Sequence, residues 1–256
     1  MIREKLIEKN VGKSKKFRWR SHEISRIEGL SDAVFAFAVT LLVVSLEVPK
    51  TFTELMETMR GFGAFTISFG LLMVVWYNQY KFFRRYGLQD TYTVVLNAAL
   101  LFVVLFYVYP LKFLFTWLLS PLFGGGEAHL PGGVVEPMVG GREQMATLMI
   151  IFGAGYIAVF TVFVLLYLHA YRQRAALDLN MLEVFDTRND IQECVLNVCV
   201  GLLSVGVVII GGPRFAGVAG VLYMFIGVVM TINGTLMGRS RRKLEERFTA
   251  SATEAA

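Results

Sequence analysis

Cysteine and histidine are scarce in this sequence of 256 residues. The two cysteines, Cys194 and Cys199, lie five positions apart in one apolar run, so they do not share a face of a helix. We expect both to be small buried hydrophobic residues, and neither a disulfide nor a metal site. The three histidines, His22, His129 and His169, lie in separate polar or interfacial segments, so no cluster resembles a metal site.

Catalytic motifs and long polar stretches are absent as well. The chain has no nucleophile elbow, no P-loop and no metalloprotease motif. Six long apolar runs and their short connectors use nearly the whole chain, which leaves no room for a separate soluble catalytic domain. We therefore predict no catalytic residues, no bound metal and no enzymatic activity, and a membrane-embedded enzyme ranks last among the alternatives.

What the chain has in excess is apolar sequence in long runs. Hydrophobic residues make up 55% of the chain and its mean hydropathy is +0.56, whereas a soluble globular domain is about 45–50% apolar. A helix needs about 20 mostly apolar residues to cross the hydrocarbon core of a bilayer. We predict an all-α integral membrane protein with six transmembrane helices. Their approximate ranges are 33–48, 61–79, 93–114, 146–168, 194–210 and 215–237.

Basic residues collect on one side of the predicted membrane. Of the 25 Lys and Arg residues, 20 fall in the two terminal segments and in the connectors after the second and fourth helices, and five fall on the opposite side. The positive-inside rule then places both termini in the cytoplasm. We divide the chain into a basic N-terminal segment (1–25), a six-helix transmembrane domain (26–238) and a C-terminal tail (239–256).

Three further patterns bear on this topology. The net charge of +5 is no sign of a nucleic-acid partner, because the basic residues cluster at helix ends, where they set orientation. The basic start and first apolar run resemble a signal peptide, yet no small-x-small cleavage site follows, so we expect a retained helix. The Gly- and Pro-rich residues 120–141 predict an extracytoplasmic loop, since this composition disfavours helix and strand.

The densest motif lies at the start of the first predicted helix. Arg26 precedes Leu30-Ser31-Asp32 there, and Asp32 lies just inside the first apolar run. An ionised carboxylate in that position is costly unless it is paired, hydrogen-bonded or in contact with water. The residues alone leave two alternatives open: Ser31 or Asp32 caps the start of a helix, or Asp32 is a functional carboxylate.

This motif resembles the signature of the transmembrane protein 175 family of potassium channels. The signature is Arg, three or four residues, and an aromatic-Ser-Asp triplet, and this chain has Leu30 in place of the usual Phe. The resemblance extends over about residues 22–115. Its softer parts are residues 33–49, Trp76-Tyr77-Asn78, Phe82-Phe83 and residues 96–110. Where the family usually has His after the Trp, this chain has Gln79 and Tyr80.

The resemblance implies a passive, potassium-selective channel without a cofactor, assembled as a homotetramer in the plasma membrane of a bacterium or archaeon. It also implies a pore lined by the first helices, since neither the family nor this chain has a Thr-Val-Gly-Tyr-Gly filter. By position in the family motif, a hydrophobic constriction falls on Phe37, Leu41 and Val44, and a polar layer falls on Thr40. The implied structural network consists of Arg26, Ser31, Asp32 and Trp76.

A helical wheel gives an independent check on the constriction. Leu41 lies about 40° from Phe37 and Val44 about 20° to the other side, so the three form one narrow stripe, with Thr40 about 60° off. Ser31 and Asp32 lie about 120–140° away. We therefore expect Asp32 to point into the helix bundle and to bond a polar group on a neighbouring helix. Without the resemblance, the stripe is more typical of lipid-facing or packed side chains.

Two other functions stay open. A proton-permeable cation channel would use a similar path, and a secondary transporter would need an ionisable or broken-helix element near the midplane. Asp32 is the only clear intramembrane acid, and it lies near the inner end of its helix. Glu47, near the outer end, either attracts cations or is an ordinary interfacial charge. The intramembrane amides are expected to bond between helices; they are Asn97, Asn197 and Asn233.

Overall fold

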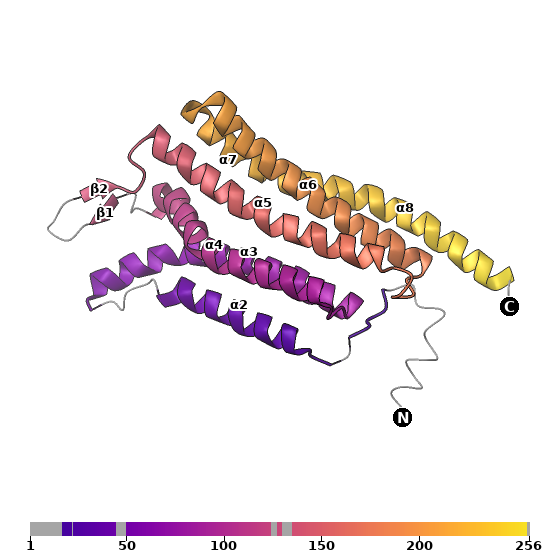
Figure 1. Ribbon diagram of the computed structural model, residues 1–256. Helices are drawn as coiled ribbons and strands as arrows, with labels where there is room; N and C mark the ends of the chain where they lie inside the picture. Colours follow the sequence, from indigo (N-terminus) through magenta and orange to yellow (C-terminus); the bar gives the residue numbers. More distant parts are fainter. Residues whose placement is uncertain (1–16, 22, 45–49, 124–126, 130–134, 255–256) are drawn as a thin grey trace.

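The computed structural model describes residues 17–21, 23–44, 50–123, 127–129 and 135–254. These residues form an elongated bundle of long helices, with α2 along one edge and α8 along the opposite edge (Figure 1). The helices are α2 (Arg26–Val44), α3 (Phe52–Tyr86), α4 (Thr91–Phe123), α5 (Arg142–Arg172), α6 (Met181–Gly211), the 3₁₀ turn η1 (Pro213–Phe215), α7 (Ala216–Met224) and α8 (Ile226–Glu254). Two short strands, β1 (Glu127–His129) and β2 (Val135–Pro137), lie between α4 and α5.

Among the described residues, five helical segments are long and apolar enough to cross a membrane, and they contain the second to sixth predicted spans. They are Phe52–Tyr86, Thr91–Pro121, Arg142–Arg172, Met181–Gly211 and Pro213–Glu246. The predicted first span extends into residues 45–49, which lie outside the described residues, and the rest of it belongs to the 19-residue α2. The predominantly helical membrane fold is therefore confirmed, while six spans and two cytoplasmic termini stay predictions.

Several helices continue well beyond the apolar run that predicted them, and their caps explain where they begin and end. The Thr51 side chain accepts a hydrogen bond from the Glu54 amide before α3, and α3 ends at Gly87 with a φ of 61°. That left-handed conformation favours glycine. α6 begins with a capping box in which Asn180 and Glu183 exchange side-chain-to-backbone hydrogen bonds. Polar residues thus extend these helices past the apolar core.

Two predicted segments differ from the structure. The loop expected over 120–141 is wrong in part, because α4 continues to Phe123 and β1 pairs antiparallel with β2. Backbone groups make this ladder, so side-chain composition gives little sign of it. The single helix expected over 215–237 is interrupted at Phe225, between α7 and α8. α8 then continues to Glu254, so most of the C-terminal tail is helical.

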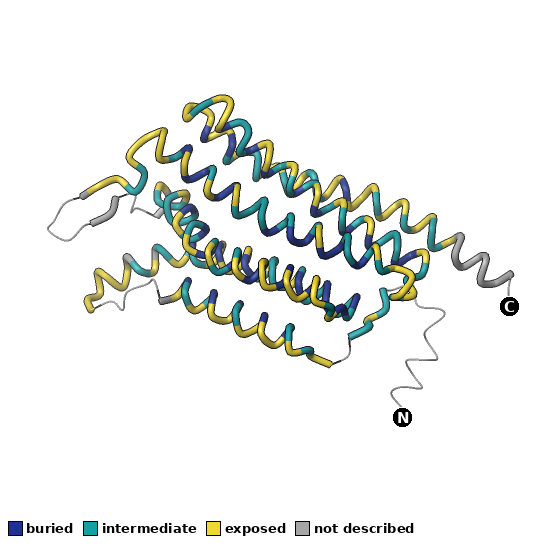
Figure 2. Tube along the Cα trace, in the orientation of Figure 1, coloured by how far each residue is buried: buried dark blue, intermediate teal, exposed yellow. Residues whose placement is uncertain are grey.

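Large apolar and aromatic side chains fill the core between α3, α4 and α5. Phe82, Tyr86, Leu100 and Tyr167 are each at most 1% exposed, and buried residues follow the inward side of the helices along the bundle (Figure 2). A Cβ at position 155 would lie 2.2 Å from the Tyr107 ring, so the glycine there lets α4 approach α5 closely.

The two cysteines lie on different faces of α6, and both are free thiols. Cys194 is buried, as predicted. The same prediction for Cys199 is wrong, because this side chain is exposed. A five-residue separation turns the helix by about 140° from one side chain to the next, so only one of the two reaches the packed face.

Candidate functional site: the two faces of α2

A capping box formed by Ser25 and Glu28 closes the start of α2. The Ser25 hydroxyl accepts a hydrogen bond from the Glu28 amide at 3.2 Å, and Glu28 Oε1 accepts one from the Ser25 amide at 3.2 Å. Glu28 is buried, and Nε of Arg84 on α3 lies 3.8 Å from its Oε2. Because α2 begins at Arg26, the alternative in which Ser31 or Asp32 caps the helix is wrong.

One face of α2 packs against α3 and α4. Ser31, Ala38 and Leu42 are 0% exposed, and Phe35 is 2% exposed. These positions follow one another at intervals of three and four residues, which is the spacing of a single helix face. Phe35, Ala38 and Leu42 belong to the main apolar core, so this inner face is fixed in the bundle.

Buried polar side chains connect the inner face of α2 to the next two helices. Gln79 Nε2 on α3 donates to Asn97 Oδ1 on α4 at 2.8 Å, and both residues are 2% exposed. Asn97 Nδ2 donates to Ser31 Oγ at 2.9 Å, and Ser31 Oγ donates to the carbonyl of Ile27 at 2.8 Å. Because buried polar groups are costly when unpaired, this chain of hydrogen bonds holds α2 in one rotation.

The expected role of the intramembrane amides is confirmed. Besides the bonds of Asn97, Asn197 on α6 accepts a hydrogen bond from the Tyr156 hydroxyl on α5. Asn233 on α8 accepts one from Gln192 Nε2 on α6 at 2.9 Å. Each amide therefore joins two helices.

Asp32 bonds to a neighbouring helix but does not point into the bundle. Trp76 Nε1 on α3 donates to Asp32 Oδ1 at 2.8 Å, as expected of a polar partner. Asp32 is exposed, however, while the adjacent Ser31 is buried, so the expected inward orientation is wrong for Asp32. Consecutive side chains are about 100° apart around a helix, and only Ser31 lies on the packed face. Arg26 is exposed, and its side chain forms no hydrogen bond or ion pair with a described residue.

The opposite face of α2 is exposed. Phe37 is 56% exposed and Thr40 is also exposed, whereas Leu41 is half-buried against the main core. Thr40 therefore lies within the exposed face and Leu41 at its border. Val44 is the last residue of α2, and neither its side chain nor any part of Glu47 falls within the described residues.

A lysine on α4 holds the far end of α2. Lys112 Nζ donates to the carbonyl of Leu42 at 2.9 Å. A cation at a helix C-terminus is favourable because the last carbonyl groups carry a partial negative charge. The capping box, the Trp76 bond, the buried amides and Lys112 thus fix α2 along its length. The sequence pattern does not predict this contact, because it marks Lys112 only as a basic residue near the end of a predicted span.

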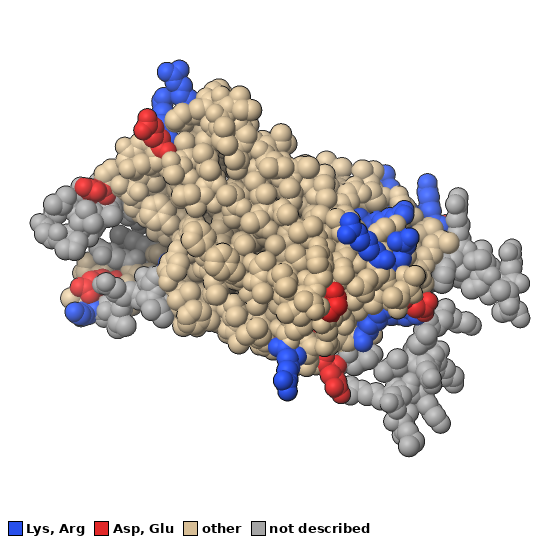
Figure 3. All heavy atoms as spheres, viewed as in Figure 1, with Lys and Arg blue, Asp and Glu red and all other residues tan. Residues whose placement is uncertain are grey.

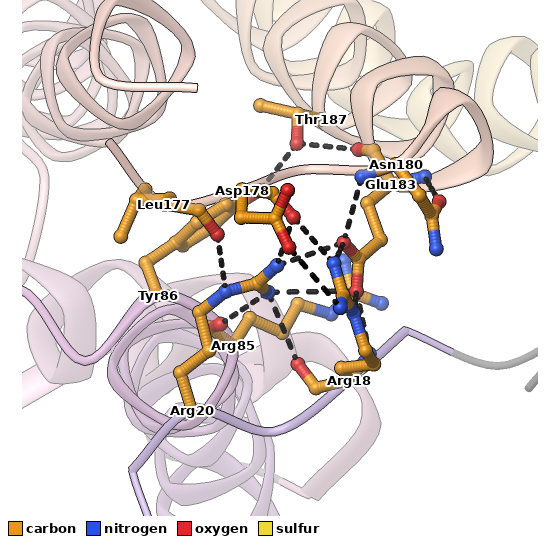
Figure 4. A network of polar contacts seen from close by, with 9 residues as sticks. All are labelled: Arg18, Arg20, Arg85, Tyr86, Leu177, Asp178, Asn180, Glu183 and Thr187. Atoms are coloured by element: carbon orange, nitrogen blue, oxygen red, sulfur yellow. Dashed lines mark hydrogen bonds and ion pairs between the residues drawn. The ribbon is translucent and has the colours of Figure 1, made fainter. Parts of the chain in front are cut away.

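A polar cluster joins the N-terminal segment to the start of α6 (Figure 4). Glu183 is 1% exposed, and its Oε2 lies 2.9 Å from Arg18 Nη2 and 2.8 Å from Arg20 Nη2. Hydrogen bonding to this carboxylate raises the pKa of the Arg18 guanidinium above its usual value. Arg20 Nε also donates to the Leu177 carbonyl at 2.9 Å. The sequence pattern marks these arginines only as determinants of topology, although Asn180-x-x-Glu183 is a recognisable capping pattern.

Ion pairs join neighbouring helices at the same end of the bundle. Asp190 on α6 pairs with Lys81 at 2.9 Å and with Arg85 at 2.5 Å, both on α3. Asp186, also on α6, pairs with Arg241 on α8 at 2.7 Å. Among the described residues, no group of three His, Cys, Asp or Glu side chains is placed to hold a metal ion.

Comparison with known sequences identifies relatives along most of the chain. Residues 26–107, from α2 into α4, match the family described as endosomal/lysosomal potassium channel TMEM175. A protein of Marivirga tractuosa named potassium channel is 40% identical over 243 residues, which cover 94% of this chain and 98% of that protein. A potassium channel of Chamaesiphon minutus is 33% identical over 107 residues, or 39% of this chain and 53% of that protein.

Two solved structures have similar folds. A crystal structure of a variant of the potassium channel MtTMEM175, bound to a nanobody fusion, matches with a TM-score of 0.75 at 39% identity. The match covers 89% of this chain and 99% of that one. A lysosomal potassium-selective channel TMEM175 homologue from Chamaesiphon minutus matches with a TM-score of 0.52 at 22% identity, over 81% of this chain and 98% of that one. At that identity the second match supports the fold alone.

Proposed function

Because the chain belongs to the TMEM175 family of potassium channels, we propose that it is a potassium-selective passive channel with a pore lined by α2 from four identical subunits. The family and the matched relatives are ion channels, so the chain is not an enzyme. The observation that carries the proposal is the division of α2 into an inner face locked in the bundle and an exposed face bearing Phe37 and Thr40.

A pore lined by α2 needs more than one copy of the chain. α2 lies along one edge of the bundle, so its exposed face is accessible to neighbouring subunits (Figure 1). Closed rings of identical subunits are the usual form of a symmetric assembly. In a ring of four, the α2 helices surround the axis, while α5 to α8 lie away from it and face lipid.

The constriction in this proposal is apolar. Phe37, Leu41 and Val44 contribute rings of large side chains, and Phe37 is 56% exposed in the single subunit. A narrow ring of apolar side chains gates ions by excluding water from the pore. Selectivity then depends on the free energy of removing water from the ion. That free energy is larger for an ion that binds its hydration shell more strongly, as sodium does compared with potassium.

Thr40 supplies the polar layer. Its hydroxyl donates a hydrogen bond to the Ala36 carbonyl at 2.9 Å. With its proton directed at the backbone, the hydroxyl oxygen keeps lone pairs for a passing cation. Four such oxygens around the axis replace part of the hydration shell of a potassium ion near the apolar rings.

The remaining parts of the proposal concern placement in the cell. The chain spans the plasma membrane of a bacterium or archaeon six times, with α2 as the first span and both termini in the cytoplasm. Ions move down their gradient, so conduction needs no cofactor and no chemical step. The excess of basic residues in the two terminal segments and in the connectors after the second and fourth predicted spans supports this orientation.

Single-channel recording tests the proposal. Purified protein in planar bilayers, with potassium on one side and sodium on the other, is expected to give unitary currents whose reversal potential shows a preference for potassium. A secondary transporter gives turnover without unitary currents. A proton-permeable channel gives a reversal potential that follows the pH gradient. Either of these results would replace the proposed function.

A further inference from the structure

Two arginines near the end of α5 and the start of α6 share one aromatic partner. Arg18, Arg20, Lys81, Arg85 and Arg241 are all paired with carboxylates. Arg174 and Arg188, by contrast, form no ion pair with any described residue. Both lie instead against the ring of one tyrosine, Tyr171, in the last turn of α5.

The contacts of this pair leave a specific set of donors unused. Arg174 Cζ lies 4.8 Å and Arg188 Cζ 5.2 Å from the centre of the Tyr171 ring. Arg188 donates to the Tyr171 hydroxyl from Nε at 3.0 Å and Nη2 at 2.5 Å, and Arg174 Nη1 donates to the Tyr171 carbonyl at 3.2 Å. Arg174 Nε and Nη2, and Arg188 Nη1, have no partner among the described residues. The Nε–Nη2 edge of an arginine is the fork that binds phosphate through two parallel hydrogen bonds.

The surroundings of the pair combine charge with an apolar surface. On the face seen in Figure 3, basic side chains gather at the end of the bundle where α5 ends and α6 begins. Val195 and Leu202 follow Arg188 on the same face of α6 at seven-residue intervals, and they are 40% and 56% exposed. Arg188 therefore lies at the head of an exposed apolar strip on a membrane-spanning helix. Tyrosine is enriched at this boundary between lipid and water.

We propose that Arg174, Arg188 and Tyr171 form a binding site for the phosphate of an anionic phospholipid. The Nε–Nη2 edge of Arg174 and Nη1 of Arg188 donate to the phosphate oxygens, while the acyl chains lie along Val195 and Leu202. Tyr171 holds the two like charges close together before the lipid arrives. A free phosphate shares the headgroup chemistry but makes no use of the apolar strip, which favours the lipid. Tyr171 lies in the last turn of α5, Arg174 in the turn that follows it and Arg188 on α6, so no residue of the site belongs to α2.

The test is titration of the purified full-length protein in detergent with dioleoyl phosphatidylglycerol, followed by native mass spectrometry of the bound lipid. The double variant Arg174→Gln/Arg188→Gln is expected to bind the first lipid about tenfold or more weakly, since a direct hydrogen bond to a charged group contributes about tenfold or more in affinity. The matched control is Arg239→Gln/Arg242→Gln on α8. It removes the same charge from two exposed arginines and is expected to change affinity less than about threefold.

Three further binding measurements separate a lipid site from a general effect of charge. Arg174→Lys/Arg188→Lys keeps the charge but loses the planar fork, so it is expected to bind nearly as weakly as the glutamine variant. Dioleoyl phosphatidylcholine, whose phosphate is neutralised by choline, is expected to bind more weakly than phosphatidylglycerol. Glycerol 1-phosphate is expected not to displace the lipid at equal concentration.

The proposal is overturned if Arg239→Gln/Arg242→Gln loses as much lipid affinity as Arg174→Gln/Arg188→Gln, because the effect is then due to net charge alone. Full binding by the lysine variant also overturns it, since the fork geometry is then irrelevant. Displacement by glycerol 1-phosphate at equal concentration shows a soluble phosphate site in place of a lipid site.

Discussion

Phe37 is the residue on which the proposed pore depends most. It is a large apolar side chain, 56% exposed, on a helix whose opposite face is locked in the core. Phe37→Ala widens the proposed constriction, so we expect single-channel potassium conductance to rise by about twofold or more and the preference over sodium to fall. Bi-ionic recording in planar bilayers measures both quantities.

The control for that variant is another exposed phenylalanine. Phe106 is 70% exposed but lies on α4 and not on the proposed pore helix, so Phe106→Ala is expected to leave conductance and selectivity unchanged. Equal effects of the two substitutions would mean that Phe37 acts through lipid contact or folding and not through the pore.

Asn97 carries a different prediction, because its role is structural. Asn97→Ala leaves the buried Gln79 amide without its acceptor and removes the donor to Ser31, so we expect a loss of about 1–3 kcal/mol of stability. Asn78→Ala is the matched control, since that amide bonds only to Val74 of its own helix. Thermal unfolding in detergent compares the two variants, and equal shifts would contradict the account.

The sequence predicted these residues to different degrees. Ser31, Asp32 and Trp76 stand out because the motif and the resemblance mark them. The buried pairing of Gln79 with Asn97 could not be predicted, because it depends on the rotation and depth of two helices that a hydropathy pattern leaves undefined. Lys112 is a further case, since only the folded chain brings its amine to the Leu42 carbonyl.

At the scale of elements, Lys112 is expected to hold the last turn of α2. Lys112→Met keeps the length of the side chain and removes the cation at the helix C-terminus. Such a charge contributes about 0.3–1 kcal/mol, which corresponds to amide exchange about two- to fivefold faster in the last turn of α2. Hydrogen–deuterium exchange of residues 38–44 measures it. Unchanged exchange there would show that the Leu42 contact does not hold this turn.

The N-terminal segment is the second element with a testable attachment. Glu183→Ala leaves Arg18 and Arg20 without their buried partner, and breaking such a pair costs about 3–5 kcal/mol. We expect trypsin to cleave after Arg18 and Arg20 much faster in this variant. Glu193→Ala, on the same helix, removes only a contact with Asn189 and serves as the control. Cleavage at the wild-type rate in Glu183→Ala would mean that the segment is held by other contacts.

Helices were easier to predict than their ends or connections. Runs of apolar residues locate α3 to α6, because burial in lipid imposes the same requirement along the whole span. The pairing of β1 with β2 and the interruption at Phe225 follow from backbone hydrogen bonding and local packing, for which composition is a poor guide. The exposure of Cys199 likewise depends on which face of α6 meets α5.

In the whole molecule, the proposed pore requires four chains around one axis. Native mass measurement of the purified protein is expected to give four times the mass of one 28.7 kDa chain. A stable monomer or dimer that still gave unitary potassium currents would contradict a pore shared by four α2 helices.

If one face of α2 lines a water-filled pore while the other is buried, cysteines introduced on the two faces differ in their reaction with a water-soluble reagent. In a Cys199→Ser background, channels carrying Thr40→Cys or Ala38→Cys are recorded in planar bilayers during exposure to a cationic methanethiosulfonate reagent. Thr40 is exposed and Ala38 is 0% exposed. The account predicts that modification blocks potassium current in the Thr40→Cys channel and has no effect in the Ala38→Cys channel. Block of the Ala38→Cys channel alone, or of neither channel, would contradict it.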